Sequence, residues 1–509
     1  MSKKKFFTLL LALVTALTMS LAGTALAADT WDGTTRGPVP APVNNVITIT
    51  TGAQLAGVAD AVNSATGTQS YVGITIRLGG DIDLNNKEWR PIGRFFQYPS
   101  SSVPNPDNKA FSGIFDGAGH SITGLKVAND STNYTNRGET AGLFGYIDFP
   151  TTAARSAARA ASVTPAAKAQ DDATALGLTG EAYDRVVAER TDLYTTFGVA
   201  PTAIQTRSVT PAPTGGVVKN LKVNGTVTNT RGQGAAGVVC WNDGLIENCY
   251  FEGTISCSPS NRSYTGGICS LLGAGTYVVN CTAKASVSAT GTIYSYAGGI
   301  AGYCYAMNTG YVVNCSVEQG SIIYSHMDTG GVVGGFANKV YNCVSAADSV
   351  TVNGQNPNIA GYFTGGIVGA FGTAYNCYWL QSSSTSTTQP ERAVGSTASS
   401  TDDPKRTLAE LPVGSVFFAP TDVTVGNTAA IVRTNYPTGA AVNIPDLTSW
   451  NSTDESVAKV LTAGNVTGYS AGTATVSTTA SSNSWSTAMS STVSVTRRAS
   501  SPLHSKPTR

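Results

Sequence analysis

The cysteines carry the most reactive side chains of this chain, which has nine of them. Five follow an asparagine and recur at steps of 32, 34, 28 and 34 residues: Cys249, Cys281, Cys315, Cys343 and Cys377. In an exported protein, nine cysteines invite a disulfide framework. However, five thiols at the same place in stacked repeats cannot all pair, and their parallel Cβ vectors suit the disulfide dihedral angle poorly. The spacing therefore favours a buried ladder of reduced thiols over disulfides.

Acid–base chemistry has few candidates. Asp116 and His120 flank a Gly-Ala-Gly sequence and have a catalytic appearance, but they lie at a turn in the opening segment, which favours a structural role. The chain has three histidines and no His-Glu-x-x-His, so the zinc peptidases of that motif are excluded. The carboxylates of the central region do not converge on one repeat position: Asp243, Glu247, Glu252, Glu318, Asp328 and Asp348. We therefore expect no catalytic residue, no metal ligand and no cofactor.

Tyrosine is the third candidate chemistry, because 13 of the 21 tyrosines lie between residues 216 and 380. An exposed aromatic cluster can stack on sugar rings or anchor a protein partner. The alternative is that tyrosine simply suits β-strands. The possible ligand-binding residues crowd one repeat and the next: Tyr294, Tyr296, Tyr303, Tyr305 and Tyr324.

The elements that hold these residues repeat from 216 to 380. The first residue of each Asn-Leu or Asn-Cys pair, from Asn220 to Asn376, recurs at steps of 28, 32, 34, 28 and 34 residues. Between these pairs lie Gly-Gly or Ala-Gly before a β-branched residue, and the segments are rich in Val, Thr and Tyr. Such a period predicts a solenoid, and the alternation of apolar and polar residues predicts strands with one buried face. We predict an all-β fold, a right-handed parallel β-helix with three strands per coil, followed by a small Ig-like β-sandwich.

Several segments resemble the GLUG motif of bacterial surface and secreted proteins. They are Ala-Gly-Leu-Phe-Gly at 141–145, Gly-Gly-Ile-Ala-Gly at 298–302, Gly-Gly-Val-Val-Gly at 330–334 and Gly-Gly-Ile-Val-Gly at 365–369. The stretch from Asp81 to Ile122 resembles the segment that opens such β-helices. The resemblance implies the fold and says little about function.

The residues before the repeats divide into a signal peptide, a spacer and a cap with the first coils. Residues 1–27 have a basic start, an apolar run and Ala-Leu-Ala, which predicts a cleaved signal peptide, with a membrane anchor as the alternative. We interpret 28–45 as a spacer, and 46–150 as an N-terminal cap and the first coils. Within the cap, Leu55, Val58, Ala59 and Val62 recur at helical spacing, so a short amphipathic helix should cover the open end of the stack.

The repeat pattern stops at residues 151–215, which are rich in Ala, Thr and Arg. We predict a flexible, partly helical insertion, with a helix beginning at Thr179. Its role is either a partner-binding arm or a tolerated surface insertion. After the repeats, 381–416 is interpreted as a linker or final wrap, and 497–509 as a disordered tail.

Residues 417–496 contain short alternating segments with turn signals, including Trp450 to Val460 and Ala471 to Ser477. Their number and length predict a β-sandwich. They resemble the bacterial Ig-like domains of group 2, which also occur in intimin- and invasin-type adhesins.

The composition agrees with an exported protein. Only 12% of the residues are charged and the net charge is +1, so nothing attracts nucleic acid or an anionic membrane. We predict an extracellular or cell-surface bacterial protein, monomeric and without a transmembrane segment in the mature chain. Its expected function is non-enzymatic and adhesin-like, with a β-helix surface that binds a glycan or protein ligand. The alternatives are a β-helix carbohydrate-active enzyme or glycan-binding component, and a purely structural envelope protein.

Overall fold

The computed structural model describes most of the repeats and parts of the C-terminal domain. The predicted signal peptide, the tail and almost all of the insertion lie outside the described residues. The described residues are 29–64, 70–96, 107–130, 139–148, 170, 184, 187, 216–352 without 274–275, 293, 305–309, 338–339 and 342, 362–375, 377–380, 390, 392–395, 416–418, 421–430, 433–435, 450–462, 465–482 and 485–496.

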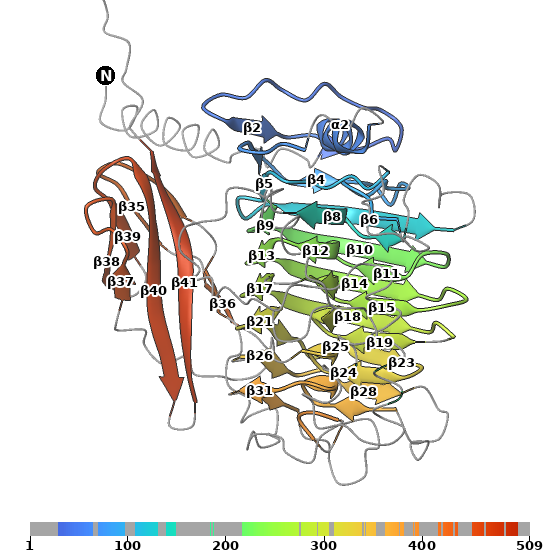
Figure 1. Cartoon of the computed structure of the whole chain (residues 1–509). Coiled ribbons are helices and arrows are strands. Elements are labelled where there is room, and N and C mark those ends of the chain that lie inside the picture. The colour runs from blue at the N-terminus through green and yellow to red at the C-terminus, as the bar shows by residue number, and fades with distance from the viewer. Residues whose placement is uncertain are drawn as a thin grey trace, which may run out of the picture.

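The repeats form a parallel β-helix, as predicted (Figure 1). Each full coil runs through four sheets, which we name B, A, D and C in chain order. Strands β13 (Leu245–Glu247), β14 (Tyr250–Cys257), β15 (Ser263–Gly266) and β16 (Cys269–Leu272) make one such coil. The prediction of three strands per coil is wrong, because the Gly-Gly segment bends the chain and divides one expected strand into two.

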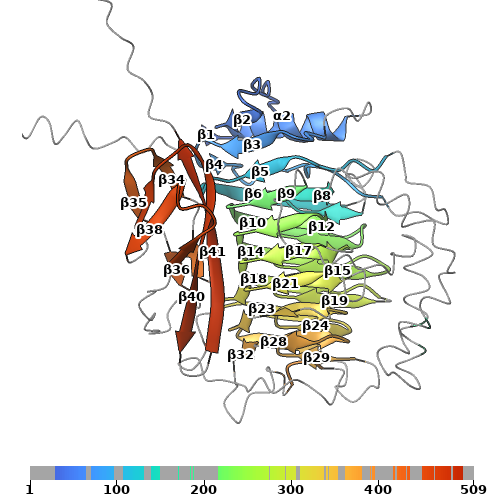
Figure 2. The same ribbon diagram turned by 60° about the vertical axis from the view of Figure 1, so that its left-hand side comes forward.

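Sheet A has 11 strands and sheet B has 9, stacked one above the other along the solenoid (Figure 2). Besides β14, sheet A contains β1 (Asp29–Thr30), β4 (Ile82–Asp83), β6 (Ser121–Asn129), β10 (Lys222–Asn229), β18 (Thr282–Ala289), β22 (Ser316–Val317), β23 (Ile322–Ser325), β27 (Val344–Ser345), β28 (Ser349–Val352) and β32 (Tyr378–Trp379). Besides β13, sheet B contains β2 (Val46–Ile49), β3 (Thr75–Leu78), β5 (Ile114–Asp116), β9 (Val217–Lys219), β17 (Tyr277–Val279), β21 (Tyr311–Val313), β26 (Val340–Tyr341) and β31 (Ala374–Tyr375).

Sheets C and D have 6 strands each. Besides β15, sheet D contains β7 (Thr140–Ala141), β11 (Gly234–Ala236), β19 (Ser295–Gly298), β24 (Asp328–Gly330) and β29 (Thr364–Gly365). Besides β16, sheet C contains β8 (Phe144–Asp148), β12 (Val239–Asp243), β20 (Ala301–Cys304), β25 (Val333–Gly335) and β30 (Val368–Ala370).

The Gly-Gly bend between sheets D and C explains the repeated glycines. A Cβ on Gly299 would lie 2.4 Å from the Gly331 carbonyl oxygen and 2.4 Å from Val317 Cγ2, a side-chain atom of sheet A. A Cβ on Gly302 would lie 2.6 Å from the backbone nitrogen of Thr265 in sheet D. Only glycine permits these approaches, so the bend reaches inward to sheet A while the backbones of sheets C and D lie in contact.

The corner between sheets B and A is built by asparagine. Asn220, Asn248, Asn280 and Asn314 have φ values of 57°, 50°, 53° and 52°, the left-handed region that asparagine tolerates. The Asn248 Nδ2 donates to Asn220 Oδ1 at 3.1 Å. The left-handed corner thus recurs at these four positions, and the side chains of Asn220 and Asn248 are joined across neighbouring coils.

Alternation along the strands gives the solenoid its core. Phe251, Ile255 and Val287 point inward and are fully buried, together with the five repeated cysteines. The charged neighbours Glu252 and Lys284 occupy the opposite phase and form an ion pair of 3.3 Å between Oε1 and Nζ. The predicted parity of these strands is therefore confirmed.

Helix α2 (Gly52–Asn63) covers the N-terminal end of the stack, as predicted (Figure 1). Thr51 Oγ1 accepts a hydrogen bond from the Gln54 backbone nitrogen, which caps the helix. The buried face contains Leu55, Val58 and Val62, because these residues pack on the first coil. The helix thus shields the open end of the core from solvent.

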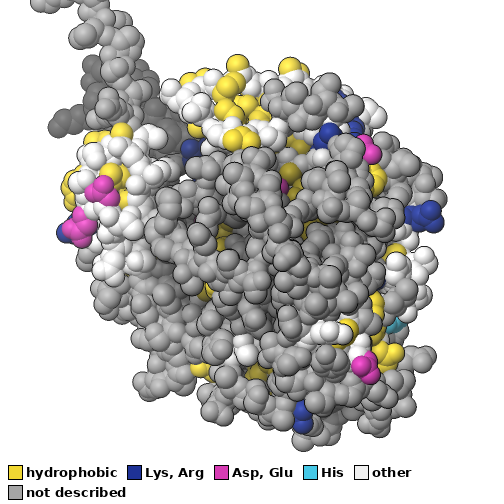
Figure 3. Space-filling model, in the orientation of Figure 1, with side chains coloured by type: hydrophobic (Ala, Val, Ile, Leu, Met, Phe, Trp, Pro, Cys, Tyr) yellow, Lys and Arg dark blue, Asp and Glu magenta, His cyan; other side chains and the backbone are white. Residues whose placement is uncertain are grey.

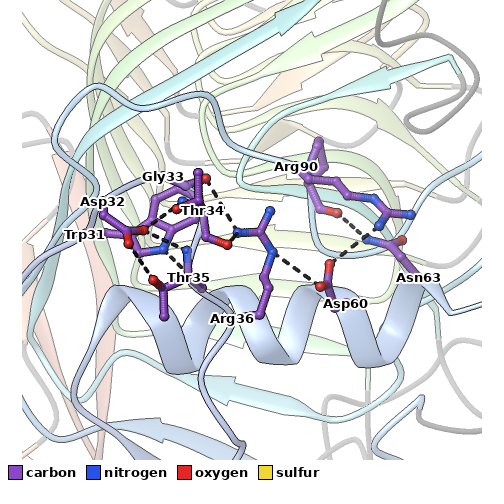
Figure 4. A network of polar contacts seen from close by, with 10 residues as sticks. Trp31, Asp32, Gly33, Thr34, Thr35, Arg36, Asp60, Asn63 and Arg90 are labelled. Carbon is purple, nitrogen blue, oxygen red and sulfur yellow. Dashed lines mark hydrogen bonds and ion pairs between the residues drawn. The ribbon is translucent and has the colours of Figure 1, made fainter.

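Polar contacts fix this helix to the first coil (Figure 4). Asp60 accepts from Arg36 at 3.3 Å and from Arg90 at 3.5 Å, and Asn63 Nδ2 donates to the Pro91 carbonyl at 2.7 Å. The predicted spacer at 28–45 is wrong for its first part. There β1 pairs with β4, and the buried Trp31 ring contacts the edge of Trp89, because an indole this large is drawn into the core.

The stack continues across the insertion. Before it, β8 pairs with β12 of the next coil; after it, β9 pairs with both β5 and β13. In that next coil the same corner, between β12 and β13, is crossed by Gly244 alone. The insertion is therefore added at one corner between sheets C and B without changing the strand register.

The last coil is extended by the segment predicted as linker or final wrap. Val394 forms a parallel bridge with Val368, and Ala393 and Val394 are buried. Trp379 Nε1 also donates to the Pro390 carbonyl at 3.2 Å. Residues 390 and 392–395 therefore belong to the solenoid.

The C-terminal domain has a separate core of small apolar residues, including Val423, Val466 and Val476. Its sheets contain two, four and three strands, and a long hairpin joins β40 to β41. This is the predicted all-β, Ig-like arrangement. The strands are β33 (Val416–Phe418), β34 (Thr421–Thr424), β35 (Thr428–Ala430), β36 (Arg433–Asn435), β37 (Trp450–Ser452), β38 (Ala458–Thr462), β39 (Asn465–Gly468), β40 (Gly472–Ser482) and β41 (Trp485–Thr496).

Candidate functional site

The tyrosine cluster does not form the exposed surface that the sequence suggests. Tyr296 and Tyr303 are fully buried, with ring centroids 4.8 Å apart. Tyr264 stacks on Tyr296 at 5.9 Å, and Phe336 contacts Tyr303 at 5.2 Å. These rings fill the space where sheets D and C meet, so the prediction of an exposed cluster is wrong for Tyr296 and Tyr303. Tyr305 lies outside the described residues.

Tyr294 and Tyr324 are half-buried and remain candidates for ligand contact. The Arg262 guanidinium lies over the Tyr294 ring, 5.6 Å from its centroid, at the corner between sheets A and D. Tyr324 stands on the outer face of sheet A, in register with Ser288 and Thr351. The two tyrosines therefore belong to different parts of the wall and do not make one aromatic platform.

Asp116 is occupied by a turn. Its Oδ1 accepts hydrogen bonds from the Ala118 backbone nitrogen and from Asn220 Nδ2, each at 2.9 Å. It is thus the first rung of the asparagine ladder. His120 Nδ1 lies 3.5 Å from Asp81 Oδ1, which also accepts from the Ser121 backbone nitrogen at 2.8 Å. The Ser121 bond is the main cause that lowers the pKa of Asp81, and these contacts brace the corner between sheets B and A.

A column of alternating charge runs along the outer face of sheet B: Arg77, Asp116, Lys219 and Glu247 lie in register on neighbouring strands. Such cross-strand pairs of opposite charge stabilise a sheet. Burial raises the pKa of Glu247, and the Lys219 ammonium opposes that effect. This column cannot be predicted from the sequence, because only the strand register brings together residues so far apart in the chain.

Asp243 is also held by its neighbours. Its Oδ2 accepts hydrogen bonds from Tyr146 Oη and Trp241 Nε1, each at 3.1 Å. The Phe95 ring stacks on Trp241 with centroids 4.2 Å apart. This carboxylate therefore orients a cluster of aromatic rings against sheet C.

All nine cysteines are free and buried. Burial raises the pKa of Cys240 to about 12 and raises the pKa values of Cys257 and Cys269 well above the usual range. A thiol in such surroundings stays protonated, so these three are poor nucleophiles and poor metal ligands.

In the part of the chain that the structure describes, no three or more His, Cys, Asp and Glu side chains come together in an arrangement that could hold a metal ion. No helix in the described ranges has the length and hydropathy needed to cross a membrane. Hydrophobic side chains gather at the capped end of the solenoid (Figure 3), where Val43 and Val72 are 72% and 54% exposed.

Comparison with known proteins identifies one domain. Residues 412–489 match the bacterial Ig-like domain (group 2) family. The C-terminal domain is a bacterial Ig-like domain. Such a domain indicates a bacterial surface or secreted protein, whereas the resemblance of the solenoid repeats to the GLUG motif stays a prediction. None of the curated proteins matches this chain.

One solved structure is similar in part. It is the crystal structure of a putative immunoglobulin A1 protease from Bacteroides ovatus, 17% identical, with a TM-score of 0.40. The similarity covers 72% of this chain and 84% of that chain. A likeness at this level carries no argument about the activity of this protein.

Proposed function

We propose that this is a non-enzymatic, adhesin-like protein of the bacterial surface or secreted fraction. The outer wall of its β-helix binds an extracellular glycan or protein, and the bacterial Ig-like domain acts as a stalk or a second contact. The observation that carries the proposal is that the side chains with catalytic potential already have structural roles. Asp116 holds the asparagine turn, Asp243 holds aromatic rings, and the thiols are buried in the core.

The framework suits binding without rearrangement. Strands within the stack are hydrogen-bonded on both sides, and the residues of successive coils keep one register over sheet A. Side chains on such a wall are already ordered before a ligand arrives, so little conformational entropy is lost on binding. A rigid, repetitive wall therefore favours recognition of an extended ligand.

The test is binding of the full chain to an array of glycans and extracellular matrix proteins. We expect the protein purified by gel filtration to bind saturably to at least one class of these glycans or matrix proteins. Absence of binding to every component would contradict the proposal and favour a purely structural envelope role.

The charge column of sheet B favours one alternative, a carbohydrate-active enzyme. Asp116 and Glu247 lie two strands apart, about 10 Å, and the raised pKa of Glu247 suits a general acid. Release of reducing ends from a polysaccharide panel, abolished by Glu247→Gln, would support this alternative. We expect no such release, because Asp116 already accepts two structural hydrogen bonds.

A further inference from the structure

Nine hydroxyl side chains form a regular array on the outer face of sheet A. We call this array the hydroxyl lattice. Every second residue of three consecutive coils contributes: Thr226, Thr228 and Thr230, then Thr254, Ser256 and Ser258, then Ser286, Ser288 and Thr290.

The register places these hydroxyls in three straight columns. In the first column, Thr226 is paired with Thr254, and Thr254 is paired with Ser286. The parallel hydrogen bonding continues past the strand ends, where the backbone nitrogen of Ser258 donates to the Asn229 carbonyl at 2.8 Å. All nine side chains are exposed or half-exposed. The residues between them, such as Val227 and Ile255, are buried. Neighbouring strands are about 4.8 Å apart, and alternate residues along a strand are about 6.7 Å apart. In the central column, Ser256 Oγ donates a hydrogen bond to Thr228 Oγ1 at 3.4 Å.

The lattice carries no charge. The column beside it contains Glu252 and Lys284, which neutralise one another in an ion pair. Sheet B differs, since charged residues fill one column of its outer face. The uncharged area is bounded by charge on its other side as well, because the exposed Lys126 is paired with Thr226 in the preceding coil. Within these bounds the nine hydroxyls suit an uncharged polar ligand.

We propose that the hydroxyl lattice binds a neutral, repeating polysaccharide. This inference rests on the proposed function, and it names the ligand class and the surface. Serine and threonine hydroxyls both donate and accept, as sugar hydroxyls do, so the two arrays can exchange hydrogen bonds in many positions. These short side chains lose little rotamer entropy when they are ordered. A polymer also engages several rungs at once, which multiplies weak contacts.

The border of the lattice adds aromatic surface. Tyr324 follows Ser288 in the next coil of the same column. Tyr250 lies further out on the same face, beyond the column of Glu252. Tyrosine at the edge of a hydroxyl surface offers an apolar face to sugar C–H groups. The lattice itself contains no Trp, Tyr or Arg, the residues that dominate protein–protein hot spots, so a polysaccharide fits better than a protein partner.

The experiment uses the full chain and insoluble or immobilised polysaccharides: neutral glucan, xylan, mannan and galactan, with polygalacturonate as the anionic comparison. We expect retention on at least one neutral polymer, unchanged between low and high salt, and no retention on polygalacturonate. The triple variant Thr228→Val, Ser256→Ala, Ser288→Ala removes the central column and should weaken binding about tenfold.

The matched control is Ser349→Ala with Thr351→Val, the same residue types on β28 of the same sheet, beyond Ile322 and Tyr324. It should bind as the unaltered chain does. Both variants should melt within a few degrees of it, because exposed hydroxyls contribute little to stability. A single Ser256→Glu variant, which puts a charge in the centre, provides an independent loss of binding.

The outcomes separate the inference from the proposed function. Binding to neutral polysaccharide that survives the triple variant and Ser256→Glu would overturn the lattice while leaving an adhesin-like role. Binding to proteins but to no polysaccharide would likewise overturn the role of the lattice and leave an adhesin-like role. Thermal hysteresis of ice growth without polysaccharide retention would assign the lattice to ice and overturn the inference. Absence of any ligand would overturn both proposals.

Discussion

The backbone N–H of Cys281 donates a hydrogen bond to the Sγ of Cys315, 3.4 Å away in the next coil. The same contact at the same distance joins Cys249 to Cys281, Cys315 to Cys343 and Cys343 to Cys377. Four of the five thiols thus accept a hydrogen bond from the backbone N–H that directly follows the corner asparagine of the preceding coil. The cysteines are a structural ladder, which explains their spacing without any disulfide.

The ladder predicts cryptic thiols. A thiol reagent should label almost no cysteine in the folded protein, because all nine are buried. After unfolding without reductant, at least the five ladder thiols should react, as measured by mass spectrometry of the intact chain. Labelling that stays near zero after unfolding would show a disulfide-bonded protein and contradict the ladder.

Asn248 is predicted to stabilise its corner through its backbone and its side chain. Asn248→Ala should lower the free energy of unfolding by about 2–3 kcal/mol, because alanine is strained at positive φ and the hydrogen bond to Asn220 is lost. Asn248→Gly removes only the side-chain part and should lose less. Chemical denaturation measures both; equal losses would mean that the conformation is not the cause.

The buried tyrosines should behave as core residues. Tyr296→Ala should cost about 3–5 kcal/mol, as expected for removing a large buried aromatic side chain. Tyr324→Ala, on the outer face of sheet A, should cost less than about 1 kcal/mol. Thermal unfolding of the two variants compares them directly. A small effect of Tyr296→Ala would return this residue to the list of ligand contacts.

Glu247 should make stability depend on pH. Its pKa in the folded state is raised above the ordinary value near 4.5, so the folded protein holds this proton more tightly than the unfolded chain. The stability gained is fully present below pH 4.5 and is lost as pH rises through the folded-state pKa.

Replacement with glutamine isolates this effect. Glu247→Gln should therefore have a higher melting temperature than the unaltered protein at pH 7, and the difference should close towards pH 4. The matched control is Glu252→Gln, which removes one member of an exposed ion pair and should change stability by less than about 1 kcal/mol. A melting temperature lowered at pH 7 by Glu247→Gln would show that the Lys219 attraction outweighs burial.

The sequence predicts the stack well because period, parity and turn residues are local signals. The Asn-Cys spacing places the corner between sheets B and A, and the helical spacing of Leu55, Val58 and Val62 places the cap. The tyrosines were misplaced because alternation identifies one buried face only. At the bend beside Gly299 the chain turns inward, and sheets C and D bury rings such as Tyr303 that the period assigns to the surface.

The charge column of sheet B and the hydroxyl lattice of sheet A could not be predicted from the sequence, because both depend on the register between coils. The charges of Asp116 and Glu247 share a column although 131 residues separate them, because β9 pairs with β5 on one side and β13 on the other. The hydroxyl lattice is likewise a property of three coils in register, and the alternation of a single strand shows only one of its rows.

The central claim is binding by a rigid wall without chemical change to the ligand. The most direct measurement is capture of a bound polysaccharide or protein ligand on the full chain, followed by its release and determination of its chain length. The account predicts saturable binding and a ligand of unchanged length after prolonged incubation. Shortened products that accumulate with time, and disappear in Glu247→Gln, would contradict it.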